Sequence, residues 1–140
     1  MPNKPAITIN NNDLQYLLPF IIILSTYILT DVMGVVNKLD YAYFSGYMIY
    51  QPYRFFTAHF MHGDLNHLLA NTFGIVTTRY FIKNLLSNNN YIFIIIMLLL
   101  IPTQISINLI IDLIILNNNL SLAYGFSGII YGAYSFLLLS

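Results

Sequence analysis

One serine of this chain stands in a setting that suits a nucleophile. Ser127 lies between Gly125 and Gly128 in the segment YGFSGIIYG, residues 124–132. A serine hydroxyl becomes a nucleophile only when a neighbouring base takes its proton. The nucleophile turn of soluble hydrolases needs glycine two residues after the serine, where this chain has Ile129. Taken alone, the segment favours a helix N-cap, in which the hydroxyl accepts from backbone N–H groups two or three residues further on.

A second group of polar residues precedes this serine by about sixty positions. His67, Asn71, Gly74 and Thr78 are spaced four, three and four residues apart, so a helix places them on one face. Two interpretations remain open for this stripe. It is a packing seam between helices held by hydrogen bonds, or it is a functional site, because polar groups inside a membrane are costly.

The segment HFMHGDLNH, residues 59–67, holds all three histidines of the chain, which makes a metal site conceivable there. His62 and His67 are five residues apart rather than the four of a zincin helix, and the chain contains no glutamate to act as a base. We therefore expect no metal and no other cofactor.

The composition indicates which solvent surrounds these residues. The chain has 140 residues, of which 58% are hydrophobic and 7% charged, and its mean hydropathy is +0.70. Soluble domains carry roughly 25% charged residues, so we predict an integral, multi-pass protein of the cell membrane. A formal net charge of zero argues against nucleic acid as a partner. The absence of cysteine excludes disulfides and thiolate chemistry.

The hydropathy pattern predicts an all-α membrane protein, a helical bundle with about four transmembrane helices. A polar tail, 1–13, precedes a membrane domain, 14–140, and the predicted spans are 17–36, 65–82, 91–116 and 127–140. The third span is long enough to tilt or to break near Pro102. The tyrosine-rich stretch 37–56 is expected to be an interfacial loop containing short helices.

The fourth predicted span is short. Its fourteen residues measure about 21 Å, against about 30 Å for the hydrocarbon core. Either this helix starts below the membrane surface, or the sequence is an incomplete piece of a longer one.

The motifs, taken in order, resemble the rhomboid family of intramembrane serine proteases. That family has an aromatic–Arg pair in its first loop, a His-x(4)-His-x(3)-Asn run entering its second helix, and G-x-S-G opening its fourth. A tyrosine often follows four residues after the serine. The corresponding residues here are Tyr53 and Arg54, then His62, His67 and Asn71, then Gly125, Ser127, Gly128 and Tyr131.

The resemblance implies an enzyme that cleaves transmembrane segments of client proteins within the lipid bilayer. By analogy, Ser127 would be the nucleophile, and His67 and Asn71 would stabilise the oxyanion together with the Ser127 backbone N–H. Hydrogen-bond donors that are already positioned in a low-dielectric site stabilise a developing negative charge more strongly than they would in water. Gly125, Gly128, Tyr131, His62 and Arg54 would support the site.

The chain departs from the family pattern at the general base. The family has six helices and its base is a histidine on the sixth, whereas no histidine follows His67 here. The membrane domain is therefore expected to be incomplete at its C-terminus. His67 is poorly suited to act as both base and oxyanion donor, because a base must reach the serine Oγ whereas an oxyanion donor must point past it. The alternative is a catalytically inactive rhomboid-like protein that binds transmembrane clients.

Overall fold

The structure is a computed structural model that describes residues 13–85, 91–118 and 120–139. Within them lie five α-helices and two short strands: α1 Leu14–Tyr27, α2 Arg54–Thr57, α3 Leu65–Leu85, α4 Ile92–Ile110, α5 Ser127–Leu139, β1 Tyr43–Phe44 and β2 Leu122–Ala123. Two π-helical turns, Ile28–Val32 and Ile111–Ile115, extend α1 and α4. Single 3-10 turns occupy Lys38–Asp40, Ser45–Tyr47 and Ala58–Phe60.

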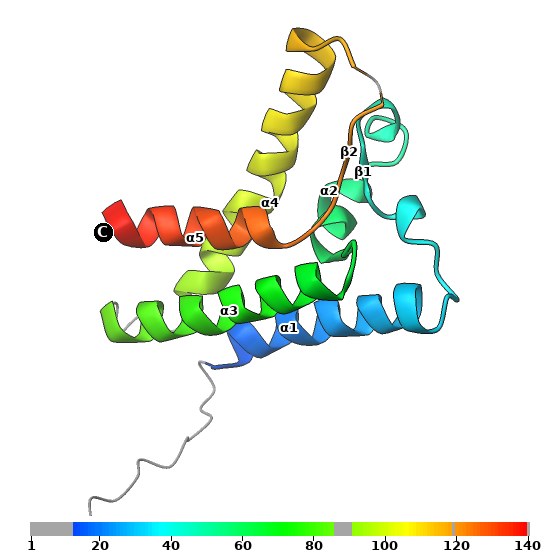
Figure 1. The fold of residues 1–140 in the computed structure, drawn as a ribbon. Coiled ribbons are helices and arrows are strands. Elements are labelled where there is room, and N and C mark those ends of the chain that lie inside the picture. Colours follow the sequence, from blue (N-terminus) through cyan, green and yellow to red (C-terminus); the bar gives the residue numbers. More distant parts are fainter. Residues whose placement is uncertain (1–12, 86–90, 119, 140) are drawn as a thin grey trace, which may run out of the picture.

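Three of the long helices lie side by side, and α4 crosses them steeply (Figure 1). Helices α3 and α5 run in the same direction, and α1 runs opposite to both (Figure 1). Helix α5 packs on both α3 and α4, and α1 packs on α3. The first turns of α3 and α5 therefore meet at one end of the bundle, which brings the two polar groups of the sequence together.

All four long helices expected from the hydropathy pattern are present, with shifted ends. The first begins at Leu14 rather than Leu17, and its π-helical turn ends at Val32, shortly before Gly34 adopts a φ of +63°. The third runs through Pro102 without a break. A proline inside a helix removes one backbone hydrogen bond and kinks the helix, but neighbouring packing keeps the remaining turns formed. Of the two possibilities expected for this span, the break is therefore wrong.

Two of these helices are long and apolar enough to cross a membrane. Among the described residues they are Leu14–Val32 and Ile92–Ile115, with mean hydropathies of 1.5 and 2.4. In the most apolar stretch of each helix, only 22% and 17% of the residues are buried in the protein, so most of the apolar side chains face outwards. A core helix of a soluble protein would be mostly covered. Helix α5 is apolar but has 13 residues, about 20 Å.

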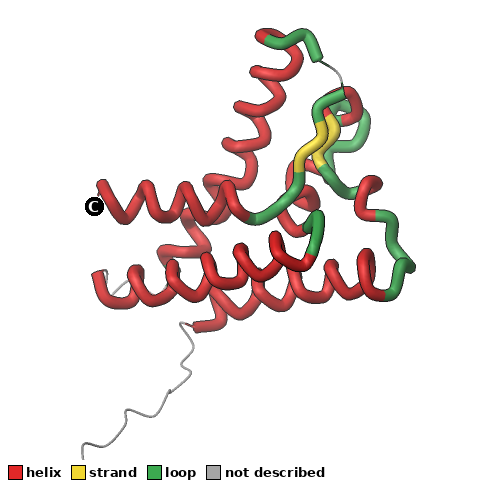
Figure 2. Tube along the Cα trace, in the orientation of Figure 1, coloured by secondary structure: helices red, strands yellow, loops and turns green. Residues whose placement is uncertain are grey.

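The first loop contains short helices, as expected, and also a strand that the sequence did not predict. β1 pairs antiparallel with β2, with Tyr43 opposite Ala123 and Phe44 opposite Leu122 (Figure 2). Two-residue strands are too short to show a periodic pattern. Their consequence is local but important, because β2 leads directly into the turn before α5 and so fixes where that helix begins. The all-α expectation needs this one correction.

Glycines allow α5 to approach its neighbours closely. A Cβ added at Gly74 on α3 would lie 2.6 Å from the Ile130 side chain, and one at Gly132 would overlap Leu100 of α4. The Tyr134 hydroxyl contacts Thr77 Oγ1 and also lies 3.3 Å from the Gly74 carbonyl oxygen. Gly132 thus lets α5 pack closely on α4, and the part of the α3 stripe around Gly74 is a helix-packing seam.

Candidate active site

Ser127 is the first residue of α5, and its neighbour Phe126 occupies the N-cap position. The Phe126 carbonyl accepts from the backbone N–H groups of Ile129 and Ile130 at 3.1 and 3.3 Å. The hydroxyl of Ser127 makes no hydrogen bond with any other residue in the described part of the chain. The N-cap interpretation of Ser127 is therefore wrong, and its Oγ is left available for another role.

The free hydroxyl opens into a pocket between α3 and α5. This pocket has a volume of about 390 Å³, and Ser127 lines it together with His67, Asn71 and Tyr131. Its remaining walls are Ala70, Phe73, Ile130 and Tyr134. The structure thus brings Ser127 together with His67 and Asn71, the first two residues of the stripe, which lie about sixty residues earlier in the sequence. The Tyr131 side chain is 69% exposed, so the pocket is open on that side.

His62 holds the side chain of Asn71. Both side chains are buried, and the His62 Nε2 lies 2.8 Å from the Asn71 Nδ2 while its Nδ1 lies 3.1 Å from the Phe60 carbonyl oxygen. A carbonyl only accepts, so the proton is on Nδ1 and Nε2 accepts from Asn71. Burial lowers the pKa of His62 to about 4, which keeps the ring neutral. One N–H of the Asn71 amide is engaged, and the second has no acceptor among the described residues.

His67 sits at the start of α3 and lies against the backbone before Ser127. The backbone N–H of His67 donates to Asp64 Oδ1 at 2.8 Å, so the Asp64 side chain caps the N-terminus of this helix. Gly125 has a φ of +119°, and a Cβ added there would lie 2.5 Å from the His67 Nε2. The Gly125 N–H donates to the Ala58 carbonyl oxygen at 2.9 Å. Glycine is therefore required at this position by its backbone conformation and by the imidazole beside it.

The backbone at the start of α5 also offers donors. The first N–H groups of a helix have no partner within the helix. Those of Ile129 and Ile130 reach Phe126, whereas those of Ser127 and Gly128 make no backbone hydrogen bond among the described residues. The Ser127 N–H, the His67 ring and the second Asn71 N–H thus belong to residues that line the same pocket as the Ser127 hydroxyl.

A second pocket touches Ser127 and contains a residue that the sequence pattern did not single out. This pocket of about 180 Å³ is lined by His59, Gln104 and Asn108, among others. The Gln104 amide fills the space beside the Gly128 Cα, and its buried Oε1 has no hydrogen-bond partner among the described residues. Polar residues four apart in the apolar segment 92–110 were the available clue, since such residues in a membrane helix are costly.

The remaining histidine and the acidic residue nearby are engaged elsewhere. The buried His59 places its Nε2 3.2 Å from the Ile101 carbonyl oxygen, which makes that nitrogen a donor. Asp64 caps α3. The described residues contain no group of three His, Cys, Asp or Glu side chains that could hold a metal ion.

Arg54 lies away from both pockets. Its Nη1 donates to the carbonyl oxygens of Leu39 and Ala42 at 2.7 and 2.6 Å, and its Nε donates to Gln51 at 2.5 Å. The guanidinium also lies over the Tyr53 ring, 5.8 Å from its centre. The structure therefore does not bring Arg54 to Ser127. Arg54 organises the first loop by filling backbone acceptors that would otherwise be buried unpaired.

Comparison with known sequences agrees with this geometry. A sequence model of the rhomboid domain matches residues 50–140, which is more than half of the chain and includes Arg54, His62, His67, Asn71 and Ser127. No curated protein and no solved structure gives a significant match. The ordered motifs, the four long helices and the matched region lead to one conclusion, which is that this chain belongs to the rhomboid family.

Proposed function

We propose that this chain carries the nucleophile and the oxyanion site of an intramembrane serine endopeptidase that cleaves transmembrane segments of client proteins. The observation that supports this most directly is the position of Ser127. Its hydroxyl has no hydrogen-bond partner among the described residues and lines one pocket with His67 and Asn71. A serine placed only for capping or packing would use its hydroxyl on a backbone group.

The proposed chemistry follows from the donors around that hydroxyl. Ser127 Oγ forms a bond to the client's carbonyl carbon while a base removes its proton, and the carbonyl oxygen becomes an oxyanion. The His67 ring, the free Asn71 N–H and the Ser127 N–H donate to that oxyanion. The C–N bond then breaks as the leaving amine takes a proton, and water hydrolyses the resulting ester to release Ser127.

We further propose that α1, α3, α4 and α5 all cross the bilayer, which makes the protein multi-pass. The outward apolar faces of the candidate spans support this. A helix of about 20 Å such as α5 fits the hydrocarbon core if it begins, at Ser127, below the membrane surface, which agrees with a site inside the bilayer. A client helix must unwind before its carbonyls become accessible, so we expect clients whose helices are easily opened.

A second candidate function is an inactive rhomboid-like protein that binds transmembrane clients. The favouring observation is that no histidine of the described chain hydrogen-bonds to Ser127. His59 and His62 are engaged elsewhere, and His67 lies against Gly125. The family resemblance implies a base on a sixth helix, and translating the gene beyond Ser140 would test for a histidine there.

A fluorophosphonate probe decides between the two functions. We expect the probe to label protein that is expressed from its natural reading frame and then placed in liposomes. The Ser127→Ala substitution should abolish this labelling. Ser135→Ala is a matched control on the same helix, because the one hydrogen bond of Ser135 Oγ among the described residues is donated to the Tyr131 carbonyl oxygen. Labelling that persists in Ser127→Ala refutes the nucleophile assignment. A folded wild type that captures a client helix but is never labelled supports the inactive alternative.

A further inference from the structure

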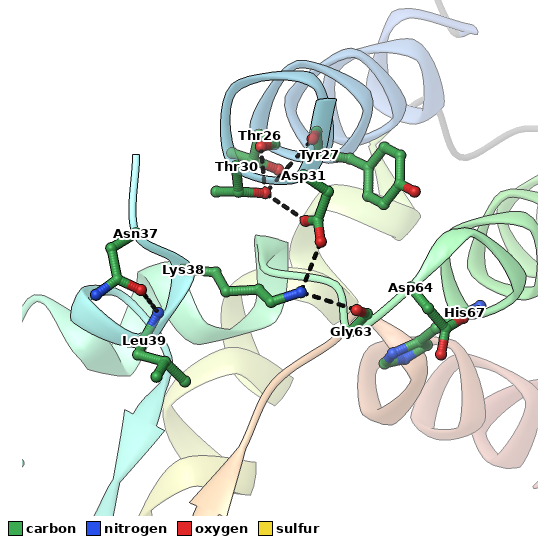
Figure 3. A network of polar contacts seen from close by, with 10 residues as sticks. All are labelled: Thr26, Tyr27, Thr30, Asp31, Asn37, Lys38, Leu39, Gly63, Asp64 and His67. Carbon is green, nitrogen blue, oxygen red and sulfur yellow. Dashed lines mark hydrogen bonds and ion pairs between the residues drawn. The ribbon is translucent and has the colours of Figure 1, made fainter. Parts of the chain in front are cut away.

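We propose that Lys38 is a positioning residue for the oxyanion site, an inference that rests on the proposed function. The Lys38 ammonium lies 2.6 Å from Asp31 Oδ1 and 2.8 Å from the Gly63 carbonyl oxygen (Figure 3). It therefore joins the end of the first helix to the turn that leads into α3. None of these three residues lines either pocket around Ser127.

The Asp31 side of this bridge is firmly held. Asp31 lies in the π-helical turn at the end of α1, and its second carboxylate oxygen is 2.7 Å from the Thr30 hydroxyl. The Thr30 hydroxyl is also 2.9 Å from the Thr26 carbonyl oxygen. The side chains of Lys38 and Asp31 are 27% and 20% exposed, so the pair is partly exposed to solvent. Asp31 is thus a fixed anchor for the ammonium group.

The Gly63 side leads directly to the proposed oxyanion donors. Gly63 stands between His62, which holds the Asn71 amide, and Asp64, which caps α3 through the His67 N–H. A Cβ added at Gly63 would lie 2.9 Å from the Tyr124 ring, so this turn also packs against the segment that leads to Ser127. A shift of the Gly63 carbonyl would therefore carry His62 with it and change the direction of the Asn71 donor.

An ordinary ion pair does not explain the arrangement. A partly exposed pair contributes little by itself. The ammonium's second contact, to a backbone carbonyl one residue away from His62, is what connects the pair to the site. Only a side chain with several donors can make both contacts, and lysine has three. We therefore assign the function to the hydrogen bond that the Lys38 ammonium donates to the Gly63 carbonyl oxygen, rather than to the charge alone.

Three variants separate these two contributions in protein made from its natural reading frame. Lys38→Met removes both contacts, and Lys38→Arg keeps charge and donors. The Asp31→Lys/Lys38→Asp double swap restores opposite charges but leaves no donor at position 38 for the Gly63 carbonyl. Fluorophosphonate inactivation gives kinact and KI separately. Asp40→Asn is the control for removing an acidic residue, because its side chain forms no ion pair among the described residues.

We expect Lys38→Met and the double swap to lower kinact by roughly ten- to a hundredfold with KI nearly unchanged, because small displacements of catalytic groups are costly. Lys38→Arg and Asp40→Asn should stay within about twofold of wild type, as surface changes away from such contacts usually do. In an Asn71→Ala background, Lys38→Met should add no further loss, because it acts through Asn71. A merely structural role would lower the melting temperature and act additively.

The outcomes keep this inference separate from the proposed function. If the wild type is labelled at Ser127 but Lys38→Met retains its kinact, the inference alone is refuted. Rescue by the double swap also refutes it, because charge would then suffice. Losses that add to those of Asn71→Ala refute it as well, because Lys38 would then act independently of that donor. If the wild type is never labelled, the proposed function fails and takes this inference with it.

Discussion

Replacing Gly125 with alanine tests whether the position of His67 matters for activity. A Cβ at this position would lie 2.5 Å from the His67 Nε2, whereas non-bonded contact distances are about 3.5 Å, so the ring must move by about 1 Å. Displacements of that size cost about a hundredfold in rate. The φ of +119° adds a separate strain of about 1–3 kcal/mol to the folded state. We therefore predict both a slower reaction and a lower melting temperature.

The two effects are separated by a matched glycine elsewhere in the chain. Gly34 has a φ of +63°, and nothing lies within 4 Å of a Cβ added there. Gly34→Ala should therefore lower the melting temperature but leave the rate of fluorophosphonate labelling unchanged. In a His67→Ala background, Gly125→Ala should cause no additional loss of rate. A folded Gly125→Ala protein labelled at the wild-type rate would refute the assignment of His67 to the oxyanion site.

Three further predictions concern the residues around this site. Asn71→Ala should lower turnover by about 10²–10³ with a much smaller change in KM, because the donor acts mainly on the oxyanion; an unchanged turnover in steady-state kinetics would contradict this. The pKa of His62 is about 4 in the folded protein, below its usual 6.5, so stability is full above about pH 6.5 and falls as the pH drops towards 4. Thermal unfolding across that range should show this decline, and it should be weaker in His62→Phe. Gly74→Ala should cost about 1–3 kcal/mol in chemical denaturation, and Ile130→Val should recover part of it by removing the methyl group that the new Cβ meets.

The long helices could be predicted because a membrane imposes a simple rule on sequence. Apolar stretches of sufficient length form helices in which all backbone groups are paired, whatever lies beside them. Their ends were less well predicted. The first helix stops at Val32 because its last turn becomes π-helical, and Gly34 then adopts a left-handed conformation. Hydropathy contains no information about such a turn.

The residues that line the candidate site were predicted, whereas the catalytic role of each residue stays a prediction. The four-residue spacing placed His67 and Asn71 on one face, and the G-x-S-G motif singled out Ser127. The sequence favoured an N-cap for Ser127 when taken alone, and the structure gives that place to Phe126. Gln104 was missed because polar residues in an apolar helix do not reveal what they face.

The sequence by itself determined the membrane-compatible composition, the four long helices and the residue types available for chemistry, because these depend on local hydropathy and spacing. Tertiary structure alone decided which of these residues meet. The β1–β2 pair and the parallel packing of α3 and α5 bring Ser127 into one pocket with His67 and Asn71. Tertiary packing also placed Arg54 in the first loop and connected Lys38 to Gly63. Contacts between residues far apart in a chain depend on how its helices pack, which no local pattern specifies.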